Sequence, residues 1–437
     1  MTGKSESAMR FHDTYDVLVA GGGPSGLIAA VAAARSGART ALIESHGFLG
    51  GTATAGMVAQ IYGFFYGTER RIVGGLPFEF VQRLEQSGAS TGFYDYTMAE
   101  LTDFAVVART LPFDPELYKC IADDFAQSAG VHLQYHTSVI DTIVDEDGRV
   151  AGVVTASNEG VRRLSAAVTI DCTGDGVVAL RAGCSELPSD EVQPMTLCFR
   201  MGNVDLARYK ALSREEKRRL VQRGLAEGRL FWQGMSVTPT PNAGEVLSLT
   251  SRVLNRSSRS AADVTAAEIE GRKQVRLTID FLRENVPGFE NARLVAIAPH
   301  IGIRETRRIR GVAMLDDDTV LRGMIPADTV ALGGGPVDIH EAGGAAFKEL
   351  RLPEGGPFGI PYGALIPAER SGLLVAGRCL SATRAAYSAV RHMGNCMAMG
   401  HAAGVAAALS IQRNLPPHQL PVAMLQEALQ QQGAYLS

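Results

Sequence analysis

One stretch near the N-terminus constrains the fold of this chain more than any other. Residues 15–44 read YDVLVAGGGPSGLIAAVAAARSGARTALIE. The apolar run at 16–20 is typical of a buried parallel strand, and the three glycines after it permit a tight turn. A small-residue helix at 27–36, a glycine stop at Gly37 and an apolar strand at 40–43 complete a strand–helix–strand unit. This pattern predicts an α/β protein with a parallel sheet.

Three glycines of this unit form a G-x-G-x-x-G motif, and an acid follows the second strand about twenty residues later. Unpaired N–H groups at a helix N-terminus attract a pyrophosphate, and a carboxylate at the strand end accepts hydrogen bonds from ribose hydroxyls. The same acid would repel the 2′-phosphate of an NADP-type ligand. A glycine turn without a ligand is the alternative. The predicted dinucleotide contacts are Gly21, Gly23, Pro24, Ser25, Gly26, Glu44 and Ser45.

The sequence after Glu44 distinguishes between dinucleotides. Residues 45–56 read SHGFLGGTATAG, a small-residue loop that can run close along an extended ligand. The chain here resembles flavoproteins of the glutathione-reductase structural type, and more narrowly an FAD-dependent oxidoreductase family whose first lobe reads E-x-x-G-x-L-G-G-T-A-T. The resemblance implies an FAD-binding domain of Rossmann-like fold in which Gly50, Gly51 and Thr52 contact FAD. His46 beside the loop raises the alternative of covalent flavin attachment.

Later segments resemble the same family. Residues 167–176, AVTIDCTGDG, form a strand ending in a glycine turn, and residues 372–382, GLLVAGRCLSA, match the family's L-L-V-A-G-R-C. The helix that begins within 391–397 would point its N-terminus at the pyrimidine end of the flavin. The further FAD contacts implied by the resemblance are Val139, Thr173, Gly174, Asp175, Gly377, Arg378, Asn395, Cys396 and Met397.

Arg304 follows an apolar, strand-like run within the family-like segment G-I-R-E-T-R-R-I. A buried arginine at this place is suited to clamp a substrate carboxylate with its planar fork of donors. It is equally suited to a structural ion pair with Glu305 or Asp338, and both roles stay open. For Arg307 and Arg308 the structural role is favoured.

His340 closes a second family-like segment, P-V-D-I-H. It is a candidate acid or base because an unperturbed histidine titrates near neutral pH, and a hydrogen-bonded structural histidine is the alternative. The predicted catalytic set is His340, Arg304, Tyr362 and Arg391. Histidine or tyrosine would move the proton, and the arginines would hold an anionic substrate or the reduced flavin.

No second G-x-G-x-x-G with a strand and a helix around it is found, so an NAD(P)H domain is not expected. The favoured function is an FAD-dependent dehydrogenase or oxidase that takes a hydride from a C–H or N–H bond of a small molecule onto the flavin. Dioxygen or a quinone would reoxidise the flavin. The alternative is an FAD-dependent monooxygenase using NAD(P)H and dioxygen, because residues 175–181, DGVVALR, approximate the D-G-x-x-S-x-x-R motif of aromatic-ring hydroxylases.

The length of 437 residues predicts two lobes. We expect a discontinuous FAD-binding domain at 1–190 and 355–437, and an α+β substrate-binding or cap domain at 191–354. In the second of these, Thr265 and Glu268 predict a capping box that starts a long helix.

A net charge of −4 gives no electrostatic footprint for nucleic acid or an anionic membrane. The Ala-rich stretch at 397–411 is too short to span a bilayer and predicts a buried helix. Six cysteines without a C-x-x-C pair, together with a polar N-terminus, suggest a reduced cytoplasmic protein, and no metal-ligand spacing is present. The sequence neither predicts nor excludes a homodimer.

Overall fold

The computed structural model describes residues 11–189 and 192–437. The predicted boundary at residues 190–191 lies outside the described residues, so the division into 1–190, 191–354 and 355–437 stays a prediction. Within the described residues no helix is long and apolar enough to cross a membrane.

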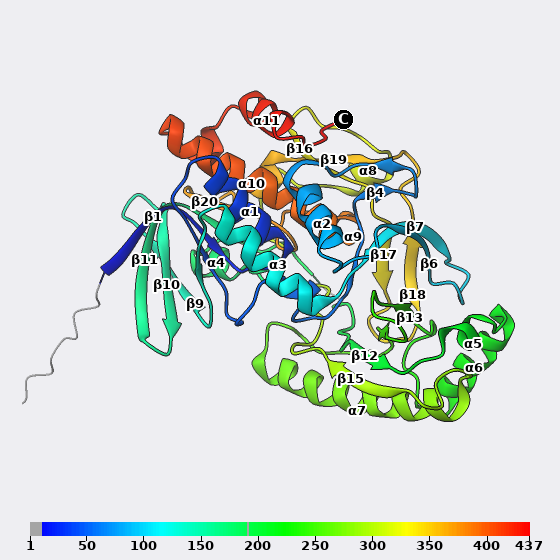
Figure 1. Cartoon of the computed structure of the whole chain (residues 1–437). Coiled ribbons are helices and arrows are strands. Elements are labelled where there is room, and N and C mark those ends of the chain that lie inside the picture. Colours follow the sequence, from blue (N-terminus) through cyan, green and yellow to red (C-terminus); the bar gives the residue numbers. More distant parts are fainter. Residues whose placement is uncertain (1–10, 190–191) are drawn as a thin grey trace, which may run out of the picture.

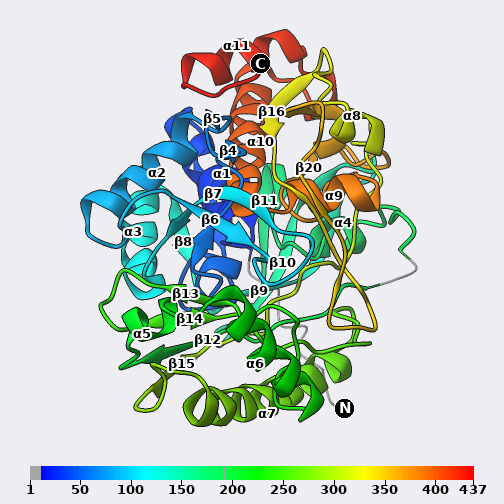
Figure 2. The ribbon, with the colours of Figure 1, turned by 90° about the vertical axis from the view of Figure 1, so that its right-hand side faces the viewer.

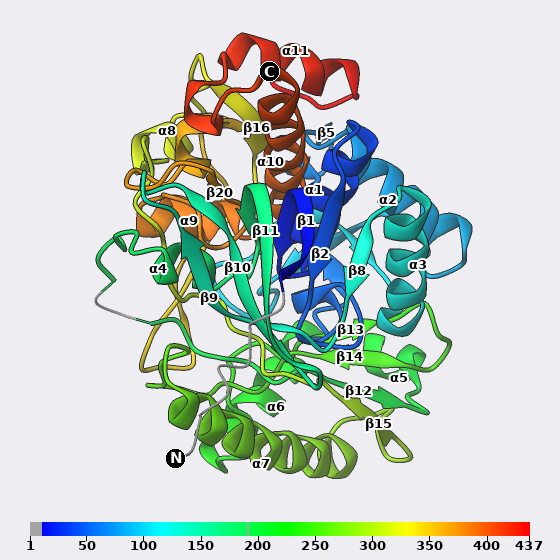
Figure 3. The ribbon, with the colours of Figure 1, turned by 90° about the vertical axis from the view of Figure 1, so that its left-hand side faces the viewer.

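The larger sheet has the strand order β8-β2-β1-β11-β10-β9, and β20 pairs with the far end of β11 (Figure 3). Its strands are β1 (Phe11–Ala20), β2 (Thr40–Ile43), β8 (His132–Gln134), β9 (Ser138–Val144), β10 (Val150–Ser157), β11 (Gly160–Asp171) and β20 (Leu373–Val375). β8, β2, β1, β11 and β20 run parallel, whereas β9 and β10 form an antiparallel hairpin beside β11. The expected α/β, Rossmann-like architecture with a parallel sheet is confirmed.

Two helices of small residues cover the parallel part of this sheet (Figure 1). Helix α1 (Pro24–Arg35) follows the first glycine turn and packs against α10 (Met393–Arg413), from the other end of the chain. The close approach requires glycine, because a Cβ at Gly400 would overlap the carbonyl oxygen of Ser25. The first βαβ unit and α10 thus form one body, although about 350 residues separate them in sequence.

The second lobe contains an antiparallel sheet with the order β13-β14-β12-β15, and a long helix runs beneath it (Figures 1 and 2). These strands are β12 (Phe199–Gly202), β13 (Val237–Pro239), β14 (Val246–Ser248) and β15 (Arg293–Ile297). The helices of this lobe are α5 (Leu206–Lys210), α6 (Arg214–Ala226) and α7 (Ala261–Asn285). The lobe therefore mixes helices with an antiparallel sheet, in line with the α+β expectation.

The remaining strands form smaller sheets. They are β3 (Gln60–Ile61), β4 (Phe65–Tyr66), β5 (Arg70–Arg71), β6 (Tyr94–Met98), β7 (Val106–Pro112), β16 (Thr329–Gly333), β17 (Val337–His340), β18 (Phe347–Arg351) and β19 (Phe358–Pro361). The remaining helices are α2 (Gly75–Gln86), α3 (Pro115–Ser128), α4 (Val177–Arg181), α8 (Asp317–Leu321), α9 (Arg384–Val390), α11 (Val422–Gln431) and the 3₁₀ turns η1 (Gly51–Ala53), η2 (Tyr362–Leu365) and η3 (Pro417–Gln419). The antiparallel trio β3-β7-β6 and the pair β17-β18 lie where the lobes meet, and they supply walls of the site described next.

Candidate active site

A cavity of about 760 Å³ runs from the first glycine turn into the second lobe. This volume lies within the range of small-molecule and cofactor sites. Gly21 and Glu44 line one end, and Trp232 and Phe347 line the other. The two lobes therefore share a single continuous site.

The first turn of α1 forms the seat for a phosphate group. Gly23 is the N-cap residue of this helix, and no side chain caps it, so the first N–H groups keep their donors for a ligand. Gly21 has a φ of +95°, and a Cβ there would lie 2.6 Å from the carbonyl oxygen of Cys172. A Cβ at Gly26 would overlap the carbonyl oxygen of Gly21. The two glycines thus allow helix, turn and β11 to approach closely, and Gly26 acts by packing because it does not line the cavity.

Glu44 lies at the end of β2 with only 7% of its surface exposed. Its Oε2 accepts the backbone N–H of Gly22 at 2.7 Å, and its Oε1 accepts from Ser45 Oγ at 3.0 Å and from His46 N at 2.8 Å. The His46 Nδ1 lies 2.9 Å from the same Oε1. Burial raises the pKa of Glu44, but the bonds from His46 and Gly22 outweigh it, so the net shift is downward. Glu44 is therefore an ionised acceptor, and its Oε2 keeps capacity for a ribose hydroxyl.

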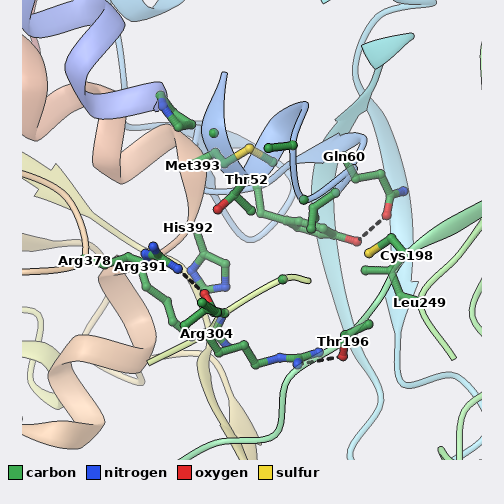
Figure 4. A pocket seen from close by; sticks show the side chains of 18 of the residues that line it. Thr52, Gln60, Thr196, Cys198, Leu249, Arg304, Arg378, Arg391, His392 and Met393 are labelled. Atoms are coloured by element: carbon green, nitrogen blue, oxygen red, sulfur yellow. Dashed lines mark hydrogen bonds between the residues drawn. The ribbon is translucent and has the colours of Figure 1, made fainter. Parts of the chain in front are cut away.

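The other end of a dinucleotide site is formed by η1, by the residues after β20 and by the start of α10. Thr52, Gly377, Arg378, Met393 and Cys396 line the cavity there. Figure 4 shows Thr52 and Met393 above Arg378 in this region. The N-terminus of α10, like that of α1, has no side-chain cap. At α10, however, the N–H of Gly394 donates to the carbonyl oxygen of Tyr62 at 2.8 Å, so fewer N–H groups are left for a ligand there than at α1.

Most of the predicted cofactor contacts line the cavity. They are Gly21, Gly23, Pro24, Ser25, Glu44, Ser45, Gly51, Thr52, Val139, Thr173, Gly174, Asp175, Gly377, Arg378 and Cys396. The residues that do not line it are Gly26, Gly50, Asn395 and Met397. Asn395 is buried and its amide donates to the carbonyl oxygens of Gly63 and Leu332, while Met397 is buried in the core. These residues hold the walls in place.

Asp338 and His340, from β17, form the centre of a charged cluster deeper in the cavity. Asp338 Oδ2 accepts Nη2 of Arg391 at 2.6 Å. Although burial raises the pKa of Asp338, the charge of Arg391 and the hydrogen bond from His340 hold it well below its usual range. Arg252 Nη1 lies 2.9 Å from Nδ1 of His340. The cluster joins residues that lie up to 139 positions apart in the sequence.

Both ring nitrogens of His340 are occupied. A guanidinium only donates, so Nδ1 accepts from Arg252, and the ring proton must sit on Nε2, 3.2 Å from Oδ1 of Asp338. Burial and the charge of Arg304, only partly offset by Asp338, lower the pKa of His340 to about 3. His340 is therefore neutral at pH 7 with no free lone pair, and this geometry favours the alternative of a structural histidine.

His392, the N-cap residue of α10, has the opposite tautomer. Its Nδ1 lies 3.2 Å from the carbonyl oxygen of Ala389, which only accepts, so the proton sits on Nδ1. Its Nε2 is buried and has no hydrogen-bond partner among the described residues. Burial and the charge of Arg391, partly offset by Asp338, lower the pKa of His392 to about 4. His392 thus lines the cavity as a neutral imidazole, and its unused lone pair is on the buried Nε2 (Figure 4).

An aromatic and amide wall faces this cluster. Gln60 donates to the Tyr94 hydroxyl at 2.6 Å and accepts from the Tyr62 hydroxyl at 3.2 Å. Burial raises the pKa of Tyr62 well above its usual value, so the phenol stays protonated. Cys198 and Leu249 lie next to Gln60 in Figure 4 and add apolar surface. The wall thus places phenol hydroxyls and apolar surface opposite the charged cluster.

Tyr362 does not reach the cavity. Its side chain is 2% exposed, and its hydroxyl donates to the carbonyl oxygen of Pro417 at 3.0 Å. Its place in η2 thus gives no support to the proton-transfer role expected from the sequence. Conversely, sequence reasoning missed Arg252, His392 and Gln60. His392 adjoins the predicted Arg391, whereas nothing in the sequence around Arg252 signals a site.

Among the described residues, no group of three or more His, Cys, Asp or Glu side chains is placed to hold a metal ion. FAD fits the residues present, since the uncapped turn of α1, the glycine cradle and the ionised Glu44 match its pyrophosphate and ribose.

Comparisons with known proteins agree with this fit. The family model described as FAD dependent oxidoreductase matches residues 16–429. A dihydrolipoyl dehydrogenase from Trypanosoma brucei brucei is 58% identical over 38 residues, a match that spans 9% of this chain and only 8% of that protein.

Two solved structures resemble the whole chain at low identity. A flavin-dependent brominase has a TM-score of 0.50 at 13% identity, and the match covers 96% of this chain and 83% of the other. A geranylgeranyl bacteriochlorophyll reductase-like protein from Thermoplasma acidophilum has a TM-score of 0.49 at 16% identity, with 97% and 84% covered. The likeness to the brominase extends to the fold alone.

Proposed function

This chain belongs to the FAD dependent oxidoreductase family, and we propose that it is a dehydrogenase or oxidase acting on a C–H or N–H bond of a small molecule. The observation that supports this proposal is the continuous cavity, which joins an FAD-binding end to a charged chamber lined by aromatic side chains. We also propose the narrower assignment to the glutathione-reductase structural type, on the sequence motifs alone.

The residues that would hold FAD are those of the two uncapped helix starts and the acid between them. The first turn of α1 would take the pyrophosphate, Glu44 the ribose, and the segments at 377–378 and 393–396 the flavin end. When bound, FAD supplies the two-electron acceptor for the hydrogen that leaves the substrate carbon or nitrogen.

The second substrate hydrogen leaves as a proton, and we propose Nε2 of His392 as its acceptor in place of His340. His392 is neutral and its Nε2 has no partner in the described part of the chain, whereas the lone pair of His340 is engaged by Arg252. Arg391 becomes a positioning residue, because its charge is used to hold Asp338. The wall of Gln60, Tyr62 and Tyr94 would exclude water from the reacting atoms.

The test is a screen of small molecules for flavin bleaching without oxygen. The proposal predicts that at least one substrate reduces the bound flavin without NAD(P)H. If instead bleaching needs NAD(P)H, and substrate stimulates NAD(P)H consumption in air, the enzyme is a monooxygenase. Reoxidation of the bleached enzyme by dioxygen or by a quinone then identifies the electron acceptor.

We also propose a cytoplasmic location, because all six cysteines are unpaired.

A further inference from the structure

Three arginines, Arg252, Arg304 and Arg391, line the inner part of the cavity around Asp338, whereas Glu100, which also lines the cavity, lies 4.0 Å from Nζ of Lys217. Arg391 lies 2.6 Å from Oδ2 of Asp338 and is neutralised by it. Arg378, nearer the flavin end, has Asp175 as its acidic neighbour, 3.8 Å away. His340 and His392 are neutral. The charges of Arg252 and Arg304 therefore have no carboxylate of their own.

Arg252 is held entirely by neutral groups. Its side chain donates to the carbonyl oxygens of Gly344, Glu341 and Ala346 and to Nδ1 of His340, and its guanidinium stacks 4.6 Å from the centre of the Trp232 ring. The residue is only 4% exposed. Burial and the charge of Arg304 lower the pKa of Arg252 to about 9, although nearby acids partly oppose them. The chamber thus carries a fixed, poorly compensated positive charge.

Arg304 turns one edge of its guanidinium toward the cavity. Within the described residues its donations come from Nη1, which reaches the carbonyl oxygen of Pro194 at 2.6 Å and Thr196 Oγ1 at 2.8 Å (Figure 4). Among the described residues, none accepts a hydrogen bond from Nε or Nη2, and Arg304 lines the cavity. Burial and the charge of Arg391 lower the pKa of Arg304 to about 10. Nε and Nη2 form the edge that binds a carboxylate with two parallel hydrogen bonds.

We propose that the free Nε–Nη2 edge of Arg304, with the charge of Arg252 behind it, binds the carboxylate of the substrate, so that the substrates are small carboxylic acids. Oxidation of these acids rests on the proposed function, but their binding to the oxidised enzyme does not. An anchored Nη1 leaves the guanidinium little rotational freedom, so the fork is organised before the ligand arrives.

The test uses the FAD-loaded protein in its oxidised form and follows the flavin absorbance during titration with paired probes. The probes are acetate and acetamide, and benzoate and benzamide, which differ in charge more than in shape. At least one carboxylate is expected to perturb the spectrum saturably, and its amide to bind at least about tenfold more weakly, the cost of losing a charged hydrogen-bond partner. If the amides bind as well as the carboxylates, or if neither carboxylate binds, the subsite does not exist.

Variants of Arg304 and Arg310 test whether Arg304 is the residue that binds the carboxylate. Arg304→Gln is expected to weaken carboxylate binding by at least about tenfold, and Arg304→Lys, which keeps the charge but not the fork, by less. Arg310→Gln is the matched control, because Arg310 is an exposed side chain six residues further along. Carboxylate binding that is unchanged in Arg304→Gln would overturn the proposal. The wild-type comparison of acids with amides decides it even if that variant does not fold. Flavin reduction only by neutral substrates would refute the substrate class while leaving the oxidase intact.

Discussion

At the scale of residues, His340 and His392 line the same cavity but differ in one respect: the ring lone pair of His340 accepts a hydrogen bond, whereas that of His392 has no donor among the described residues. Sequence reasoning singled out His340 because it ends a family-like segment, and it did not select His392. One long-range contact and one local contact separate them: the Nη1 of Arg252 reaches His340 from 88 positions away, whereas the carbonyl of Ala389, three residues away, fixes the tautomer of His392. Neither contact is readable from residue types, so the sequence alone could not decide between the two histidines.

This difference yields a prediction for substitution of His392. Replacing His392 by Asn should slow substrate-driven flavin reduction by about 10²–10⁴-fold, the usual contribution of general base catalysis. The measurement is the anaerobic reduction rate by stopped flow, together with the FAD content of the variant. His418→Asn, at an exposed position, serves as control. A reduction rate within a factor of about two of the wild type, with FAD fully bound, would exclude His392 as the base.

At the scale of elements, the sequence predicted the strand–turn–helix–strand unit well but placed helix starts less accurately. The first helix begins at Pro24 rather than at residue 27, because proline is already suited to the first helical position. The long helix of the second lobe begins at Ala261 with Ser260 as its cap, so the capping box predicted at Thr265 and Glu268 was wrong. Thr265 lies within the helix, and its hydroxyl donates to the carbonyl oxygen of Ala261.

The contact between α1 and α10 yields a second prediction. Gly400→Val places a Cβ where the carbonyl oxygen of Ser25 lies, which should push apart the two helices and distort the first turn of α1. We expect a loss of about 1–3 kcal/mol in the free energy of unfolding, the usual cost of overpacking, together with weaker FAD binding. Chemical denaturation and FAD titration of the apoprotein measure both quantities.

Arg413→Val is the matched control, because it adds the same side chain at an exposed position of α10. Full stability and full FAD affinity in Gly400→Val would show that α10 does not fix the phosphate seat.

At the scale of the whole molecule, the site depends on a meeting of lobes that no single motif describes. The sequence predicted the cofactor end because its glycines and acid are contiguous in the first unit. It could not predict the wall formed by β3, β6 and β7, since these short strands acquire their role only by packing against the second lobe. The pKa values of buried side chains are a second property that depends on the whole folded molecule.

The buried neutral histidines yield a prediction for the pH dependence of stability. Burial lowers the pKa of His340 to about 3 and that of His392 and His401 to about 4, whereas the unfolded chain protonates its histidines near 6.5. Between pH 6.5 and 4 the unfolded state binds more protons, so the free energy of unfolding should fall as the pH falls. Denaturant melts from pH 7.5 to 4.5 measure this loss, which we expect to shrink in His401→Gln. A stability that is constant across that range would mean that these histidines are hydrated.

The central claim, that one cavity seats FAD at the glycine turn and presents the flavin to the arginine-rich chamber, is tested most directly by the crystal structure of the FAD-loaded protein. The account predicts the pyrophosphate at the first turn of α1, the ribose at Glu44, and the flavin between Thr52 and Met393 with the Nε–Nη2 edge of Arg304 open to its substrate side. Electron density for the nucleotide elsewhere, or for a flavin ring remote from Arg304 and His392, would contradict it.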